Sequence, residues 1–122
     1  MIYYSFISYR FNSFPEDCIS VGMIFIDDET SEFKIKVSEI KMKIAKKIKI
    51  SASPHVFTMF NNSIRNLCEA DSLTLDKLDY LHRHQNGIIK IGKPSSSSCK
   101  MEDFDIMFEK RLEENFKKKE VN

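Results

Sequence analysis

Apolar positions near the start of the chain repeat with the period of a β-strand. Residues 2–11 are β-branched or aromatic with serines between them, and residues 19–26 form a second apolar run. In residues 33–37 the apolar side chains alternate with Lys34 and Lys36. Such patterns favour strands over helices. Because a short hydrophilic turn joins the second and third runs, we expect these two strands to form a hairpin.

The apolar period changes to that of a helix after Ser38. In residues 40–48 isoleucines recur every fourth position, and Ser38 can cap the start of this short amphipathic helix. Ser53 as a cap and Pro54 at the first helical position predict a second helix that reaches about residue 70. Thr74 can cap a third helix, which the Asn-Gly pair after residue 85 should end.

The last third of the chain contains one more strand and one more helix. Residues 88–91, IIKI, predict a short buried strand, and residues 92–99, GKPSSSSC, predict a loop. An apolar stripe that begins at about Met101 predicts a long final helix. The order of elements is that of an α+β domain: a small, mainly antiparallel sheet of about four strands with an early hairpin, helices packed on one face, and a long C-terminal helix. We expect one domain over residues 1–118 and a frayed tail over residues 119–122.

Gly22 interrupts the second strand, where a glycine should weaken it. A glycine inside a strand indicates a β-bulge or a close approach by a neighbouring group. An aromatic side chain lying over the bare backbone is the simplest such neighbour in a chain with ten phenylalanines. No second glycine follows to build a phosphate-binding loop, so we assign Gly22 a structural role.

Composition and charge narrow the classes of function. With 42% hydrophobic and 30% charged residues, the 122-residue chain has an ordinary globular composition. The net charge of +1 gives the whole molecule no strong attraction to nucleic acid or to an anionic membrane. Three unpaired-looking cysteines are typical of reduced thiols, and no signal peptide or membrane-spanning run is visible, so we predict a cytoplasmic protein.

Three stretches carry a resemblance to a known family. YSFISYRFNSFPEDCISVGMIFIDDETSEF resembles the opening of a family of small bacterial proteins catalogued as domain of unknown function 3037, and Pro15, Glu16, Val21 and Gly22 match that pattern. Ser20 stands where the family usually has Asn, which argues against a polar role for this position. GIIKIGKP and FDIMFEKRLEEN resemble the family's closing strand, loop and helix. The resemblance implies an accessory or regulatory protein whose partner is a kinase-like protein of the HipA type.

Side chains that often carry out chemistry occur here without the spacing that such chemistry needs. His82 and His84 are two residues apart, so on a helix they point in nearly opposite directions and cannot share one tetrahedral metal ion. The carboxylates of residues 27–29 lack the glycine and the final Glu of a calcium loop. No nucleophile occurs in a recognisable catalytic motif. We therefore predict no enzyme activity, metal or cofactor, while a hydrolase or nuclease with unassigned acidic residues stays a third option.

Seven lysines and one acidic residue lie between Lys34 and Lys49, which predicts a locally positive surface. Such a surface binds phosphates with little specificity and strong salt dependence. The alternative function is therefore a nucleic-acid-binding module that uses Lys41, Lys43, Lys46 and Lys47. The ordinary interpretation of the same lysines is a solvated surface that keeps the protein soluble.

Protein contact is the function that the sequence favours. Phe11 and Phe14 lie in a predicted loop beside Pro15 and Glu16, and exposed aromatic side chains often dominate binding energy. Capping of the open end of the sheet explains the two phenylalanines equally well. The first strand offers a second route, by strand addition, if it lies at a sheet edge. We predict a non-catalytic accessory or regulatory protein that binds another protein, with Phe11, Phe14, Pro15 and Glu16 at the contact and no role at a membrane.

Overall fold

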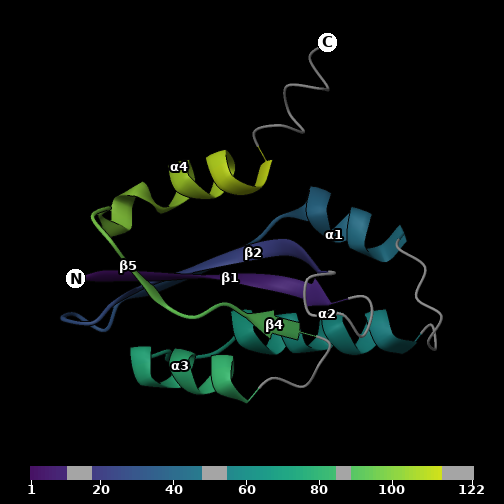
Figure 1. Cartoon of the computed structure of the whole chain (residues 1–122), viewed down its shortest axis with the longest axis horizontal. Helices are drawn as coiled ribbons and strands as arrows, with labels where there is room; N and C mark the ends of the chain where they lie inside the picture. The colour runs from purple at the N-terminus through teal and green to yellow at the C-terminus, as the bar shows by residue number, and fades with distance from the viewer. Residues whose placement is uncertain (11–17, 48–54, 85–88, 114–122) are drawn as a thin grey trace, which may run out of the picture.

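The computed structural model describes residues 1–10, 18–47, 55–84 and 89–113, and it contains one antiparallel sheet (Figure 1). Its strands are β1 (Ile2–Arg10), β2 (Cys18–Asp27), β3 (Phe33–Val37), β4 (Ile89–Ile91) and β5 (Ser95–Ser97). The spatial order is β3-β2-β1-β4, and β5 also pairs with β1. The predicted α+β class, the mainly antiparallel sheet and the hairpin of β2 with β3 are confirmed.

The serine run was predicted as a loop, and this prediction is wrong for β5. Ser95 pairs with Tyr4 and Ser97 pairs with Ile2, on the same side of β1 as β4. Strand pairing needs only backbone donors and acceptors. A short strand at the sheet edge can therefore form without the apolar side chains by which a sequence reveals a strand.

The helices begin at or near the predicted positions. They are α1 (Glu39–Lys47), α2 (His55–Cys68), α3 (Leu75–Arg83) and α4 (Phe104–Phe108). Ser38 Oγ accepts a hydrogen bond from the Lys41 N–H at 3.2 Å, and Thr74 Oγ1 accepts one from the Lys77 N–H at 3.1 Å, so both predicted caps are present. Ser53, Pro54 and the Asn-Gly pair lie outside the described residues. None of the described helices is both long enough and apolar enough to cross a bilayer.

The final helical segment is shorter and less regular than predicted. A 3₁₀ turn (Met101–Asp103) leads into α4, and a π-helical turn (Glu109–Glu113) follows it, so the described segment spans 13 residues. We call residues 101–113 the C-terminal helical segment. The expected long helix is thus not seen within the described residues, and the expected tail at 119–122 lies outside them.

Both faces of the sheet are covered, although we expected helices on one face only. Ile7 and Ile24 belong to a buried cluster with Ala45 of α1, Phe60 of α2 and Leu78 of α3. On the opposite face, a second cluster joins residues of β1 and β2 to the C-terminal helical segment: Ile2, Met23, Phe25, Phe104, Phe108 and Leu112. Figure 1 shows α4 on one side of the sheet and α2 and α3 on the other. Each face of the apolar strand β2 therefore has its own helical cover.

Gly22 has both features that were predicted for it. Ile7 pairs with Gly22 and Ser8 pairs with Ser20, so Val21 has no partner on β1 and forms a bulge. A Cβ atom at Gly22 would lie 2.8 Å from the Lys36 carbonyl oxygen and 3.2 Å from Ile7 Cδ1. The close neighbours are a backbone oxygen and aliphatic carbons, and the expected aromatic side chain is not among them.

We predict that Gly22→Ala destabilises the protein by about 1–3 kcal/mol, because the new methyl group would displace the backbone of β3. Urea unfolding monitored by circular dichroism measures this change in the free energy of unfolding. Gly92→Ala is the matched control: a Cβ there would lie 3.6 Å from its nearest neighbour, the Phe6 backbone nitrogen. Gly92→Ala should lower the free energy of unfolding by less than about 1 kcal/mol. Equal losses for the two variants would contradict the steric role of Gly22.

Candidate functional site

The aromatic loop that the sequence favours as the partner-binding site is not part of the described structure. Phe11, Phe14, Pro15 and Glu16 all lie within residues 11–17, outside the described residues. Their role in binding stays a prediction. The first strand, which we considered for strand addition, is in the middle of the sheet: β1 pairs with β2 on one side and with β4 and β5 on the other. Strand addition at β1 is therefore excluded.

One edge of the sheet is formed by β3, which among the described strands pairs only with β2, and the other edge is formed by β4 and β5 beside β1. The Asp27 N–H donates to the Glu32 carbonyl at 2.9 Å, and the Ser38 N–H donates to the Val21 carbonyl at 2.7 Å. Hydrogen-bonded and non-hydrogen-bonded pairs alternate along an antiparallel ladder. It follows that Lys34 and Lys36 bond to β2 through their backbones.

The other residues of β3 direct their backbone N–H and C=O groups away from β2. Phe33, Ile35 and Val37 occupy the alternate positions of the ladder, so their N–H and C=O groups point to the outer edge of the sheet. Their side chains are half-buried and pack against the cluster that holds α2 and α3. The edge of β3 thus combines available backbone donors and acceptors with fixed side chains.

The lysines of β3 contact the C-terminal helical segment. Lys34 Nζ donates to the Met101 carbonyl at 3.1 Å. Lys36 Nζ lies 3.7 Å from an Asp105 carboxylate oxygen and 4.9 Å from the centre of the Phe108 ring. The continuous positive surface that the sequence predicted between Lys34 and Lys49 is therefore interrupted, because its first two lysines are engaged on the face opposite α2 and α3.

The lysines of α1 divide into two groups. Lys43, Lys46 and Lys47 are exposed, and Lys46 and Lys47 lie three and four residues after Lys43, which places the three on one side of the helix. Lys41 is half-buried and lies about 200° around the helix from Lys43. Three of the four lysines predicted for nucleic-acid binding therefore share one surface.

The two histidines that were weighed as metal ligands, His82 and His84, contact different partners. His82 Nδ1 lies within hydrogen-bonding distance of the Ile91 carbonyl, at 2.8 Å, and the His84 ring packs against Tyr80 with 4.4 Å between ring centres. Within the described ranges, no group of three or more His, Cys, Asp or Glu side chains could hold a metal ion. His82 thus connects α3 to β4.

The three cysteines and Tyr9, the only buried tyrosine among the described residues, are candidates for reactive groups. Cys18 and Cys99 are half-buried, and Cys68 lies exposed at the end of α2. Partial burial, and secondarily the Glu69 carboxylate, raise the pKa of the Cys68 thiol, which disfavours the reactive thiolate. Burial also raises the pKa of Tyr9, whose ring packs on Phe60 with 4.6 Å between centres.

The acidic turn after β2 is used for local structure. Asp27 Oδ1 accepts a hydrogen bond from the Glu29 N–H at 2.9 Å, and Asp28 accepts one from the Met1 amino group at 2.9 Å. The Glu29 N–H is the main reason that the pKa of Asp27 is lowered, and the Asp28 carboxylate raises the pKa of the Met1 amino group. The carboxylates of Asp27 and Asp28 therefore serve as a turn cap and as a partner of the Met1 amino group.

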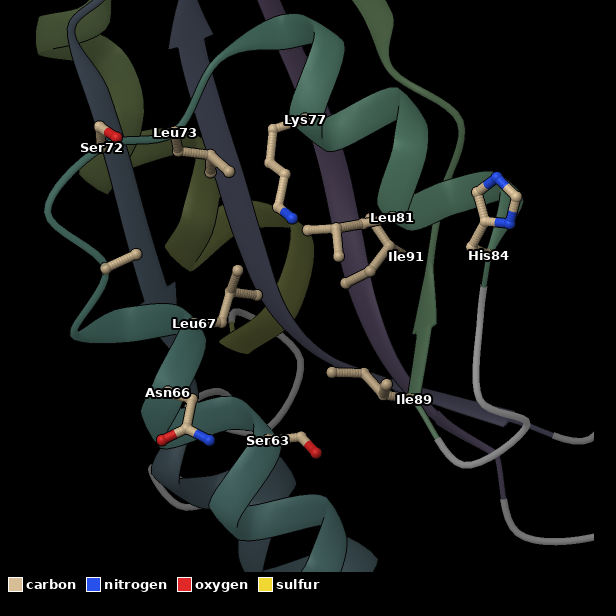
Figure 2. A pocket seen from close by; sticks show the side chains of 11 residues that line it. Ser63, Asn66, Leu67, Ser72, Leu73, Lys77, Leu81, His84, Ile89 and Ile91 are labelled. Carbon is tan, nitrogen blue, oxygen red and sulfur yellow. The ribbon is translucent and has the colours of Figure 1, made fainter.

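A cavity of about 380 Å³ lies between α2, α3 and β4 (Figure 2). Its lining is: Ser63, Asn66, Leu67, Ala70, Ser72, Leu73, Lys77, Leu81, His84, Ile89 and Ile91. Sequence reasoning missed this cavity because its walls come from three elements whose packing angle no local pattern specifies. The only local signal is that Lys77, Tyr80 and His84 follow at helical spacing on one side of α3.

Comparison with protein-family models, curated proteins and solved structures gave no match. The α+β class of the fold is defined by the structure alone, and the family resemblance described above stays a prediction.

We predict that the lowered pKa of Asp27 makes stability depend on pH in the acid range. A carboxyl group with a lowered pKa in the folded state stabilises the protein above its unfolded-state pKa of about 3.9, and this stabilisation is lost as the pH falls through the folded-state pKa. Asp27→Asn keeps an acceptor for the Glu29 N–H but removes the charge. The advantage of wild type over Asp27→Asn in the free energy of unfolding should be full above about pH 4 and should decrease as the pH falls through the folded-state pKa.

Urea titrations across this pH range measure the difference. Asp71→Asn, at an exposed position after α2, controls for the loss of one negative charge. A wild-type advantage over Asp27→Asn that is constant with pH would show that ionisation of Asp27 does not contribute.

Proposed function

We propose that this chain is a non-catalytic accessory protein that binds another protein through the outer edge of β3. The observation that supports this most is the outer backbone of Phe33, Ile35 and Val37, which has no strand partner among the described residues. An extended segment of a partner can continue the sheet there, with main-chain hydrogen bonds for affinity and alternate side chains for specificity. A kinase-like protein, which the family resemblance implies, is one candidate for this partner.

The side chains near this edge also support strand addition. Natural proteins often protect an edge strand with lysines. Here the ammonium groups of Lys34 and Lys36 are drawn to Met101, Asp105 and Phe108 on one face of the sheet. The backbone of β3 is held in place by β2 and by packing of its apolar side chains, so an incoming strand would meet a preordered edge.

Several polar side chains that could serve catalysis have structural partners. Ser8 Oγ lies 3.2 Å from Ser20 Oγ, His82 contacts the Ile91 carbonyl, and Asp27 caps a turn. A nucleophile needs an aligned base and a third group that orients the base. These contacts favour a binding role over a catalytic one.

We predict that Ile35→Pro abolishes partner binding. Proline removes the Ile35 N–H, which points to the outer edge, and leaves the hydrogen bonds of Lys34 and Lys36 to β2 in place. Ile35→Thr is the matched control, because it also shortens the side chain but keeps the N–H. Tagged wild type and both variants would be used for affinity capture from the host in the presence of nuclease, with circular dichroism to verify folding.

A stoichiometric protein that is retained by wild type and Ile35→Thr and lost with folded Ile35→Pro is the expected result. Its retention by folded Ile35→Pro would contradict binding at β3. Double replacement of Phe11 and Phe14 by Ser would then test the aromatic loop as the contact.

The nucleic-acid alternative has one observation in its favour, the shared surface of Lys43, Lys46 and Lys47. It predicts that the triple Gln variant of these residues weakens binding to duplex DNA and reduces the slope of log affinity against log salt by about one unit per lysine. Lys41→Gln, on the other side of α1, is the control. Fluorescence anisotropy with a labelled duplex measures both slopes, and equal slopes for wild type and the triple variant would exclude this surface.

A further inference from the structure

We propose that the cavity between α2, α3 and β4 binds a small apolar monocarboxylate, such as a medium-chain fatty acid. β4 and β3 lie at opposite ends of the strand order, so this site is separate from the edge that we propose for protein binding. The inference therefore does not depend on the proposed function.

The floor and walls of the cavity suit a hydrocarbon chain. Six of its eleven lining residues are aliphatic. Leu73 and Ile91 are each only 3% exposed, while Leu67, Leu81 and Ile89 are half-buried. A volume of about 380 Å³ lies within the range of small-molecule sites. An apolar cavity of about 150 Å³ holds benzene, and the volume of this cavity is about 2.5 times as large.

The polar part of the lining favours a negative charge. Lys77 and His84 line the cavity, and among the described residues no aspartate or glutamate does. Within the described part of the chain, no ion pair involves Lys77. A carboxylate is therefore the complementary head group, because Lys77 can bond to it without first breaking an ion pair.

Tyr80 helps to position both polar groups. Lys77 Nζ lies 5.1 Å from the centre of the Tyr80 ring, and the His84 ring packs on the same ring. Figure 2 shows Lys77 extending from α3 over the cavity, with Ser63 and Asn66 of α2 on the other side. The hydroxyl and amide groups from α2 add hydrogen-bond donors at the cavity rim. One cation and a few neutral donors suit a single carboxylate better than a multiply charged phosphate.

The test compares sodium octanoate with 1-octanol, which has the same number of carbon atoms and no charge, in titrations of the 122-residue chain monitored by ¹⁵N–¹H NMR. Lys77→Met removes the ammonium group and keeps both the apolar stem and the backbone N–H that bonds to Thr74. Lys93→Met, at an exposed lysine outside the cavity, is the matched control. Ala70→Leu fills the cavity, and Ser63→Met fills it from α2 should the first variant fail to fold.

We expect octanoate to bind wild type and Lys93→Met more tightly than octanol does, and to shift the amide signals of α2, α3 and β4. Lys77→Met should weaken octanoate binding about tenfold and change octanol binding less than about twofold. The cavity-filling variant that folds, Ala70→Leu or Ser63→Met, should bind neither octanoate nor octanol. The proposal is overturned if octanoate does not bind below about 10 mM, if it binds no more tightly than octanol, if Lys77→Met binds it like wild type, or if a filled cavity still binds it.

Discussion

The bulge at Val21 determines which residues of β2 reach each side of the sheet. One extra residue reverses the alternation, so Val21 and Ile24 both belong to the cluster under α2 and α3, while Met23 and Phe25 belong to the cluster under the C-terminal helical segment. Gly22 permits this geometry, because a Cβ atom at this position would lie only 2.8 Å from the Lys36 carbonyl oxygen. The bulge thus decides which side chains of β2 pack under α2 and α3 and which pack under the C-terminal helical segment.

The C-terminal helical segment, which covers the second face of the sheet, also holds the side chains along β3 in place. Ser38 is 1% exposed, and it both caps α1 and donates a hydrogen bond to Glu113 Oε2 at 2.8 Å. This contact joins the end of β3 to the end of the C-terminal helical segment. Lys34 and Lys36 join the same two elements further along the strand. These contacts hold the lysine ammonium groups on one face of β3, while its outer backbone groups keep no strand partner among the described residues.

Sequence reasoning found the features that depend on neighbouring residues. The strand at 33–37 has the predicted bounds, and Ser38 and Thr74 cap the predicted helices, because alternation and capping are local effects. The strand β5 was missed because its serines give no apolar pattern, although its backbone pairs with β1. The second cover was missed although the run of residues 21–26 is buried throughout, and a continuous apolar run is typical of a strand covered on both faces. The cavity could not be predicted, because it depends on how α2 and α3 pack against β4.

The two proposed binding sites lie at opposite edges of one sheet, and this separation limits how they can influence each other. With β1 and β2 between them, β3 and β4 are about three strand spacings apart, or roughly 14 Å. A ligand in the cavity can change the affinity of β3 for a partner only if the protein has two conformations that differ at both sites and the ligand binds one of them more tightly. The buried cluster that includes Ile7, Ile24 and Ile91 spans this distance as a packed layer, and such layers resist small continuous deformation. Occupancy of the cavity should therefore stabilise the face formed by α2 and α3 while leaving the geometry of the β3 edge unchanged.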